Sequence, residues 1–219
     1  MARTNLHRLV GVALLAAIGY ILMLFDFPIF PLFPFLKLDF SDLTVLLGGL
    51  MFGPVGGIMT ALIRSLAHFA LTGGGIVNLI GDSAAFIASV GFMLPIIWTI
   101  RGDHERPSRQ FMGMGLGIIS LTVIMSLLNW LVITPMYLAV FNFNLGMSLT
   151  KYVLIGVVPF NLVKGIVVSI LFYVIARALA PWLAKQRAQK RELMHIASQK
   201  EAVISPEWVV TASFGGMIQ

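Results

Sequence analysis

The stretch LTVLLGGLMFGPVGGIMTALI, residues 43–63, contains no formal charge. Its length matches the roughly 20 apolar residues that a helix needs to cross the hydrocarbon core of a bilayer. Its middle, residues 52–57, combines a proline, which lacks a backbone donor, with glycines, which loosen a helix. We therefore predict a tight turn there, between a helix that ends near Met51 and a short helix from Ile58 to Leu71.

The whole chain is similarly apolar. Of its 219 residues, 58% are hydrophobic and 11% are charged, and the mean hydropathy is +0.94. This composition leaves too little polar surface to coat a soluble protein of that size, so it indicates an integral protein of the lipid bilayer. Cysteine is absent, which excludes disulfides, thiolate metal sites and cysteine nucleophiles.

We predict an all-α membrane protein with six transmembrane helices. The first follows Arg3 and Arg8, and we interpret it as an uncleaved helix rather than a secretory signal. The predicted helices span residues 9–25, 43–51, 58–71, 77–100, 110–140 and 152–183. Residues 1–184 then form the membrane domain, and residues 185–219 form a basic C-terminal tail whose first part is typical of a solvated helix touching anionic headgroups.

The distribution of basic residues predicts the orientation. The termini and the polar loop 101–110 hold 11 of the 15 lysines and arginines, whereas the opposite loops hold only Lys37 and Lys151. By the positive-inside rule both termini are cytoplasmic, and the segment FPFLKLDFSDL, residues 33–43, is extracellular. Because the basic residues cluster at helix ends and not on one continuous face, we do not expect nucleic-acid binding.

Polar side chains inside the membrane are costly, so each one needs a partner, a cavity or a ligand. Asn161 and Lys164 lie three residues apart on one helix face and can address one object together. Lys164 has two interpretations: an internal ion pair with Asp82 or Asp39, or a polar ligand pocket. We favour the pocket. The candidate intramembrane polar residues are Arg64, His68, Asn78, Asp82, Asn129, Asn161 and Lys164.

Arg64 and His68 are spaced like neighbours on one helix face and could form a proton relay or part of a metal site. A metal would need more ligands at suitable spacing, so we prefer a structural pairing of Arg64 with Asp42 or with helix-end carbonyls. No nucleotide-binding P-loop, metalloprotease helix or nucleophile elbow occurs in the sequence. We expect neither an enzyme nor a metal site.

Several motifs, in order, resemble one family: FLKLDFSD at residues 35–42, LLGGLMFGPVGG at 46–57, LTGGG followed by Gly81 and Asp82, MSLLNW at 125–130 and PFNLVKG at 159–165. Together they are similar to the riboflavin-specific substrate-binding subunit, or S component, of energy-coupling-factor (ECF) vitamin transporters. The resemblance covers roughly residues 9–183. It implies a high-affinity riboflavin-binding protein of the bacterial cell membrane, with the pocket near the extracellular side.

The resemblance also implies partners. Import would require a transmembrane coupling subunit and two cytoplasmic ATPase subunits, and the missing P-loop agrees with that division of labour. The family's alanine motif on the first helix packs on the coupling subunit, and Ala13 and Ala17 occupy that position. Riboflavin would be bound as the transported substrate, so no cofactor is expected.

The resemblance implies a set of ligand contacts. Asn129, Asn161 and Lys164 match polar positions that contact the flavin, and Asp82 stands where the family often has the longer glutamate. It also implies that the first loop, between the predicted helices 9–25 and 43–51, closes over the flavin ring. The substrate-binding residues predicted in this way are Lys37, Leu38, Asp39, Phe40, Asp82, Asn129, Asn161 and Lys164.

The residues themselves suit this ligand. A flavin has a flat, largely apolar ring with carbonyl edges and a chain of hydroxyls, so it needs an apolar slot with a few directed polar groups. Leu38, Phe40 and helix-borne Met and Trp are expected to line the slot, while Lys37 and Asp39 face water or each other. Asp42 begins the second helix, where a carboxylate is favoured.

Two rival hypotheses remain at this point. A sibling S component for another vitamin, such as pantothenate or folate, would share the fold. A membrane assembly subunit without a ligand would be a different class of protein.

Overall fold

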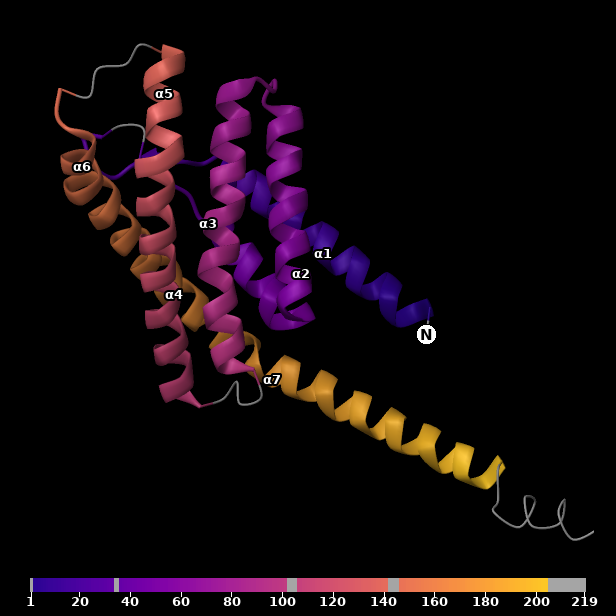
Figure 1. Cartoon of the computed structure of the whole chain (residues 1–219). Helices are drawn as coiled ribbons and strands as arrows, with labels where there is room; N and C mark the ends of the chain where they lie inside the picture. The colour runs from indigo at the N-terminus through magenta and orange to yellow at the C-terminus, as the bar shows by residue number, and fades with distance from the viewer. Residues whose placement is uncertain (1, 34–35, 102–105, 142–145, 205–219) are drawn as a thin grey trace, which may run out of the picture. The chain divides into compact units, whose positions relative to one another are not determined.

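The computed structural model describes residues 2–33, 36–101, 106–141 and 146–204. Within this part of the chain, five helical segments are long and apolar enough to cross a membrane. They are Leu6–Met23, Ser41–Leu71, Ile76–Ile100, Pro107–Ala139 and Leu149–Pro181. The all-helical membrane architecture predicted from the sequence is therefore confirmed (Figure 1).

Helix α2, Ser41–Leu71, is interrupted at one residue. Gly53 has φ 78° and ψ 177°, a conformation that side chains with a Cβ rarely adopt. Pro54 follows at the start of the next helical turn, where its missing N–H costs nothing. The predicted turn thus exists, but it is shorter than the six residues we expected, because the proline begins the second arm instead of lying in a loop.

The two arms of α2 fold back on each other. A straight helix rises about 1.5 Å per residue, which would place Ser41 and Arg64 roughly 34 Å apart. Instead, Arg64 Nη1 donates to Ser41 Oγ at 2.8 Å. Near the turn the arms touch so closely that a Cβ on Gly57 would lie 3.0 Å from the backbone of Gly49 and Val45. The glycines therefore permit an antiparallel helical hairpin.

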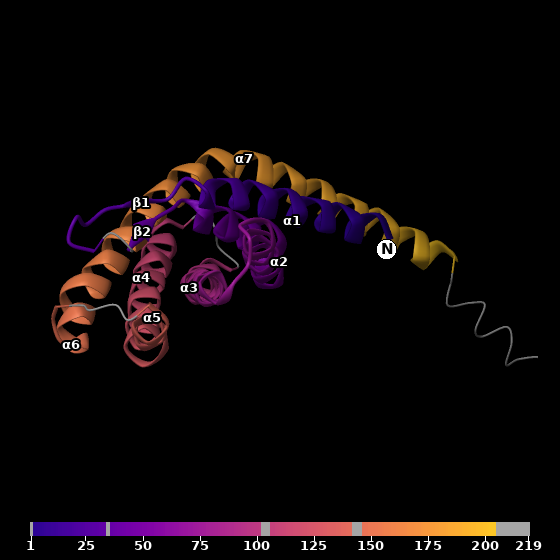
Figure 2. The same cartoon turned by 90° about the horizontal axis from the view of Figure 1, so that it is seen from above.

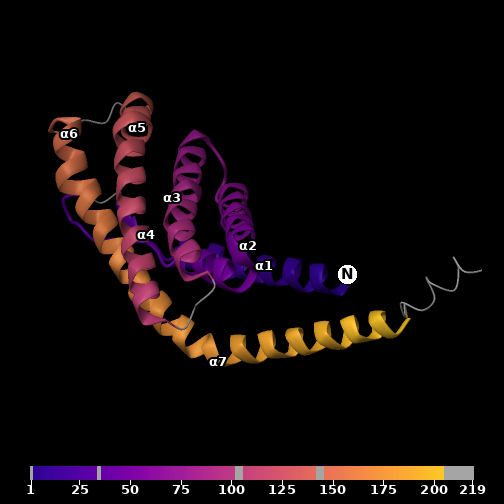
Figure 3. The same cartoon turned by 60° about the horizontal axis from the view of Figure 1, so that its bottom comes forward.

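The neighbouring helices form a row. Helix α1, Ala2–Met23, packs against α2, and α3, Ile76–Ile100, lies between α2 and α4, Pro107–Leu128 (Figures 1, 2 and 3). Helix α4 continues through the π-helical turn η1, Asn129–Ile133, into α5, Thr134–Phe141. The loop after α3 is shorter than predicted because Pro107 already begins α4, at a position that suits proline.

The last helical run begins with α6, Leu149–Tyr152, and passes through the π-helical turn η2, Val153–Val157, into α7, Val158–Ile204. The chain forms two compact units, residues 1–176 and 177–219. In the first, η2 packs against α4 and η1. In the second, residues 177–204 are helical, which agrees with the predicted helix beyond Lys185, and the predicted final tail lies outside the described residues.

A proline follows each π-helical turn at the same distance. Pro135 and Pro159 stand two residues after the ends of η1 and η2. A proline inside a helix removes one donor and clashes with the carbonyl four residues earlier, here that of Leu131 or Ile155. Both carbonyls lie in the middle of a π turn, so the wider turn relieves the clash.

The first loop contains a small ribbon that we did not predict. Strands β1, Phe27–Pro28, and β2, Lys37–Leu38, pair antiparallel, with Phe27 opposite Leu38. Lys37 is exposed, as expected, but its Nζ lies 3.0 Å from Asp26, so the expected pairing of Lys37 with Asp39 is wrong.

Phe33 fixes the loop to the last helical run. Its ring packs edge-on against Tyr152, at 5.4 Å between centroids, and joins Val153 and Val157 in a buried cluster. The loop is therefore held against η2, beside the residues that build the site described next.

Candidate functional site

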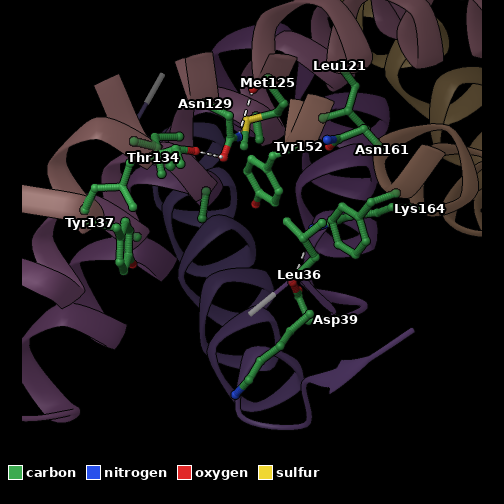
Figure 4. Close-up of a pocket in the computed structure, with 18 residues that line it drawn as sticks. Leu36, Asp39, Leu121, Met125, Asn129, Thr134, Tyr137, Tyr152, Asn161 and Lys164 are labelled. Atoms are coloured by element: carbon green, nitrogen blue, oxygen red, sulfur yellow. Dashed lines mark hydrogen bonds and ion pairs between the residues drawn. The ribbon is translucent and has the colours of Figure 1, made fainter. Parts of the chain in front are cut away.

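A cavity of about 340 Å³ lies among the first loop, α3, α4, α5 and the last helical run. Its apolar wall includes Leu36, Ala84, Ala88, Leu121, Met125, Ile133 and Phe160. Its polar side chains are Lys37, Asp39, Asn129, Thr134, Tyr137, Tyr152, Asn161 and Lys164. Figure 4 shows the labelled side chains around one hollow, with Thr134 and Tyr137 on one side and Asn161 and Lys164 on the other.

Five of the eight predicted binding residues line this cavity: Lys37, Asp39, Asn129, Asn161 and Lys164. The structure thus brings together side chains that are up to 127 positions apart in sequence. Three predicted residues, Leu38, Phe40 and Asp82, are not among the lining residues. Contact of any of the eight with a ligand stays a prediction.

The ribbon explains why Leu38 lies apart from its neighbours. Side chains alternate along a strand, so Lys37 and Leu38 point to opposite faces. Leu38 is buried, whereas Lys37 is exposed and borders the cavity. Phe40 packs its ring against Phe27 on the ribbon, at 6.1 Å between centroids, instead of facing the cavity.

Each of the two asparagine amides is oriented by its own helix. The Asn129 Nδ2 donates to the Met125 carbonyl at 2.9 Å, and the Asn161 Nδ2 donates to the Val157 carbonyl at 2.8 Å. Thr134 Oγ1 also donates to Asn129 Oδ1, at 3.3 Å (Figure 4). An amide has two N–H donors and a carbonyl acceptor, so each side chain keeps hydrogen-bonding capacity for a ligand.

Lys164 pairs with two carboxylates. Its Nζ lies 3.3 Å from Asp39 Oδ2 and 2.9 Å from Asp42 Oδ2. Of the two partners that the sequence suggested, Asp39 is right and Asp82 is wrong, and Asp42 was missed. A lysine ammonium has three N–H donors, so one remains for a ligand in the cavity that Lys164 lines. Lys164 is thus both ion-paired and part of the cavity lining, and its contact with a ligand stays a prediction.

Arg64 is fully buried and pairs with Asp42, as predicted. Its Nη1 lies 3.3 Å from Asp42 Oδ1, and its Nη2 donates to Ser89 Oγ at 2.8 Å and to the Ala85 carbonyl at 3.4 Å. Burying an unpaired charge would cost several kcal/mol, and these bonds compensate for it. The structural interpretation of Arg64 is confirmed.

Asp82 pairs with His68 instead of facing the cavity. Its Oδ1 lies 2.7 Å from His68 Nδ1, and the His68 ring packs edge-on against Tyr20. Within the described residues, no group of three histidine, cysteine, aspartate or glutamate side chains could hold a metal ion. The short side chain of Asp82 is thus paired with His68 on α2.

Sequence reasoning missed several lining residues, above all Tyr137, Tyr152 and Thr134. Thr134 precedes Pro135, and this proline was the one available signal, because it predicts a disturbed helix in which a side chain can be re-aimed. Met125 lines the cavity as expected of a helix-borne methionine, but Trp130 does not, since its ring is about half exposed on the outside of the bundle.

The site therefore has mostly apolar walls, two amides, hydroxyl groups and a lysine whose charge is compensated by aspartates. Its volume is at the lower end of the roughly 300 to 1,000 Å³ typical of small-molecule pockets. Such a lining suits a compact ligand with an apolar body and several hydrogen-bonding groups.

The comparison with known families agrees with this geometry. Residues 7–176 match the family described as "ECF transporter, substrate-specific component". The chain belongs to this family of substrate-specific components. Its members are parts of transporters and not enzymes, and the chain is accordingly a multi-pass protein of the cell membrane.

Individual relatives are named for one substrate. The chain is 35% identical to the riboflavin transporter RibU of Staphylococcus aureus (strain TCH60), over 81% of this chain and 93% of that protein. It is 34% identical to the riboflavin transporter FmnP of Bacillus subtilis (strain 168), over 84% of this chain and 97% of that protein.

A solved structure has the same fold. It is described as "Structure and mechanism of the S component of a bacterial ECF transporter", and it matches with a TM-score of 0.69 and 33% identity. The match covers 82% of this chain and 98% of the solved chain.

Proposed function

We propose that the chain is the riboflavin-binding S component of an ECF-type importer, which delivers riboflavin across the cell membrane together with an ATP-hydrolysing module. The observation that carries this proposal is the cavity in which Asn129, Asn161 and Lys164 converge. Riboflavin is the substrate named for the relatives, so sibling S components for pantothenate or folate and a ligand-free assembly subunit are not favoured.

The chemistry of the cavity supports riboflavin as cargo. The apolar wall includes the small residues Ala84 and Ala88 on α3 and the larger Leu121 and Met125 on α4, and such a wall suits a flat ring. The amides of Asn129 and Asn161 and the third N–H of Lys164 can bond the ring carbonyls or the ribityl hydroxyls. Riboflavin enters as substrate, and the proposal needs no cofactor.

The proposed topology has six transmembrane helices. Each arm of the α2 hairpin is one short span, and the fold-back between Ser41 and Arg64 supports this count. Both termini are then cytoplasmic, and the cavity, which is bordered by the first loop, opens near the extracellular side. The membrane domain of residues 1–184 would carry binding, and the basic tail of residues 185–219 would lie on the cytoplasmic side.

The proposed partners are a transmembrane coupling subunit and two ATPase subunits. Ala13 and Ala17 lie on an exposed face of α1, whereas Val12 and Ala16 point inward. Small residues spaced four apart let another helix approach closely. This exposure supports a contact of Ala13 and Ala17 with the coupling subunit.

Substitution of Ala13 by tryptophan should separate transport from binding. A bulky ring on this face should block the helix contact, so riboflavin uptake by cells that carry the whole transporter should fall at least about tenfold. Riboflavin affinity of the purified protein should stay unchanged. Val123→Trp is the matched control, because Val123 is also exposed but lies on α4. Loss of binding in Ala13→Trp would show that this helix face packs internally.

Titration of the purified protein with riboflavin tests the proposed function. Bound flavin should lose fluorescence by stacking on aromatic and apolar groups, and the titration should saturate at one flavin per chain. Pantothenate and folate, added in excess, should not displace it. A protein that leaves riboflavin fluorescence unchanged, or one from which pantothenate or folate displaces the flavin, would contradict the riboflavin assignment.

A further inference from the structure

A buried polar cluster lies directly behind Lys164. It consists of Asp42 and Arg64, on the two arms of α2, and Ser89 on α3. None of the three lines the cavity. Any effect that they have on a bound ligand must therefore pass through a neighbour that does line it.

Asp42 uses its two oxygens for different partners. Oδ1 is bonded by Arg64 Nη1, at 3.3 Å, and by the Ser89 hydroxyl. Oδ2 lies 2.9 Å from Lys164 Nζ. Two donors on one oxygen fix the plane of the carboxylate, so the other oxygen is presented to Lys164 in a fixed direction.

Arg64 also reaches the second carboxylate that holds Lys164. Its Nη1 donates to Ser41 Oγ at 2.8 Å, and the Ser41 hydroxyl donates to Asp39 Oδ1. The Ser41 backbone N–H donates to the same oxygen at 2.8 Å. Asp39 Oδ2 then lies 3.3 Å from Lys164 Nζ. Both carboxylates thus have one oxygen held on the Arg64 side and the other facing Lys164.

The charges of the two carboxylates and their two cationic partners balance. Asp39 and Asp42 carry two negative charges, and Arg64 and Lys164 carry two positive ones. Without the guanidinium, both carboxylates would act on Lys164 alone, in surroundings where charges interact more strongly than in water. Asp42 would also lose its bond from Arg64 Nη1, and the Ser41 hydroxyl, which donates to Asp39, would lose its own donor. The ammonium would then be drawn toward Asp42, which does not line the cavity, and away from a bound ligand.

We infer that Arg64 is a positioning residue for riboflavin binding: through Asp42 and Ser41 it sets where the Lys164 ammonium stands in the cavity. This inference rests on the proposed function. It assigns a binding role to a side chain that touches no part of the cavity, and it places that role on the α2 hairpin.

A double-mutant cycle tests whether Arg64 acts through Lys164. Riboflavin Kd is measured by fluorescence quenching for the wild type, Arg64→Gln, Lys164→Ala and the double variant. Arg64→Gln should raise Kd at least about tenfold in the wild type but less than about twofold when Lys164 is already alanine, since residues that act as a unit are not additive. An equal factor in both backgrounds would overturn the inference, because a merely structural role does not depend on Lys164.

Ser89→Ala covers the case in which Arg64→Gln does not fold. It removes one donor from Asp42 and one acceptor from Arg64 without leaving a buried charge unpaired. It should raise Kd about threefold in the wild type and not at all with Lys164→Ala, and an equal factor in both backgrounds would again overturn the inference. Thr60→Val is the control. Thr60 is buried on the same arm of α2 as Arg64, but its hydroxyl donates to the Gly56 carbonyl of that arm.

The outcomes separate the two proposals. A wild-type protein that fails to bind riboflavin overturns the proposed function, and the positioning role falls with it. A wild type that binds riboflavin, combined with independent effects of Arg64 and Lys164, overturns the positioning role alone.

Discussion

Lys164→Ala should raise the riboflavin Kd at least about tenfold, which corresponds to about 1.4 kcal/mol of binding free energy. The change removes the ammonium that α7 contributes to the cavity lining and that pairs with Asp39 and Asp42. It also leaves those two carboxylates with Arg64 as the remaining positive partner of the cluster. Removing one member of a buried ion pair costs about 3 kcal/mol or more, so the unfolding temperature should fall as well.

Two further variants separate these effects on binding and stability. Lys151→Ala is the matched control, because Lys151 is an exposed lysine of the same helical run that does not line the cavity. It should change neither affinity nor unfolding temperature. Asn161→Ala alters no charge but should also weaken binding about tenfold, because its amide lies one helical turn from Lys164. If affinity survived both Lys164→Ala and Asn161→Ala, the cavity would not be the flavin site.

Gly57→Val should destabilise the protein by about 3 kcal/mol or more, because the hairpin of α2 has no room for a side chain there. A Cβ at this position would lie 2.7 Å from Met93 Cε and 3.0 Å from the backbone of Gly49 and Val45. The methionine can move aside, but the backbone atoms belong to the opposite arm. The arms would have to separate, and with them Ser41 and Arg64. Thermal unfolding in detergent measures this change.

The matched control for the hairpin is Gly115→Val. Gly115 also lies within a membrane helix, and a Cβ there would meet no atom within 4 Å. Valine at this site should leave the unfolding temperature nearly unchanged. Equal stability of Gly57→Val and Gly115→Val would mean that the two arms of α2 do not pack against each other.

The helices could be predicted from the sequence because the bilayer imposes strict rules on them. Predominantly apolar runs of sufficient length mark the spans, and glycine and proline mark the interruption at Gly53 and Pro54. The two-residue strands of the ribbon were missed, since two residues cannot show a periodic pattern. The π turns were also missed, although Pro135 and Pro159 each disturb the helix that contains them.

Several residues that line the cavity could be predicted from the sequence, but the ion pairs between the side chains could be predicted only in part. Asn129, Asn161 and Lys164 stand out because polar groups inside a membrane need partners. Which aspartate would meet Lys164 depended on the depth and direction of each side chain. The hairpin brings Asp42 to Lys164, while Asp82 is taken by His68. Such a choice follows from the packing of distant helices and cannot be derived from spacing along one of them.

An experimental structure of the protein with riboflavin bound tests the central claim most directly. We predict the flavin in the cavity between α3, α4 and α7, with Lys164 Nζ and the amides of Asn129 and Asn161 within hydrogen-bonding distance of its polar atoms. Riboflavin bound elsewhere on the chain, with this cavity still formed and Lys164 in contact only with Asp39 and Asp42, would contradict the account.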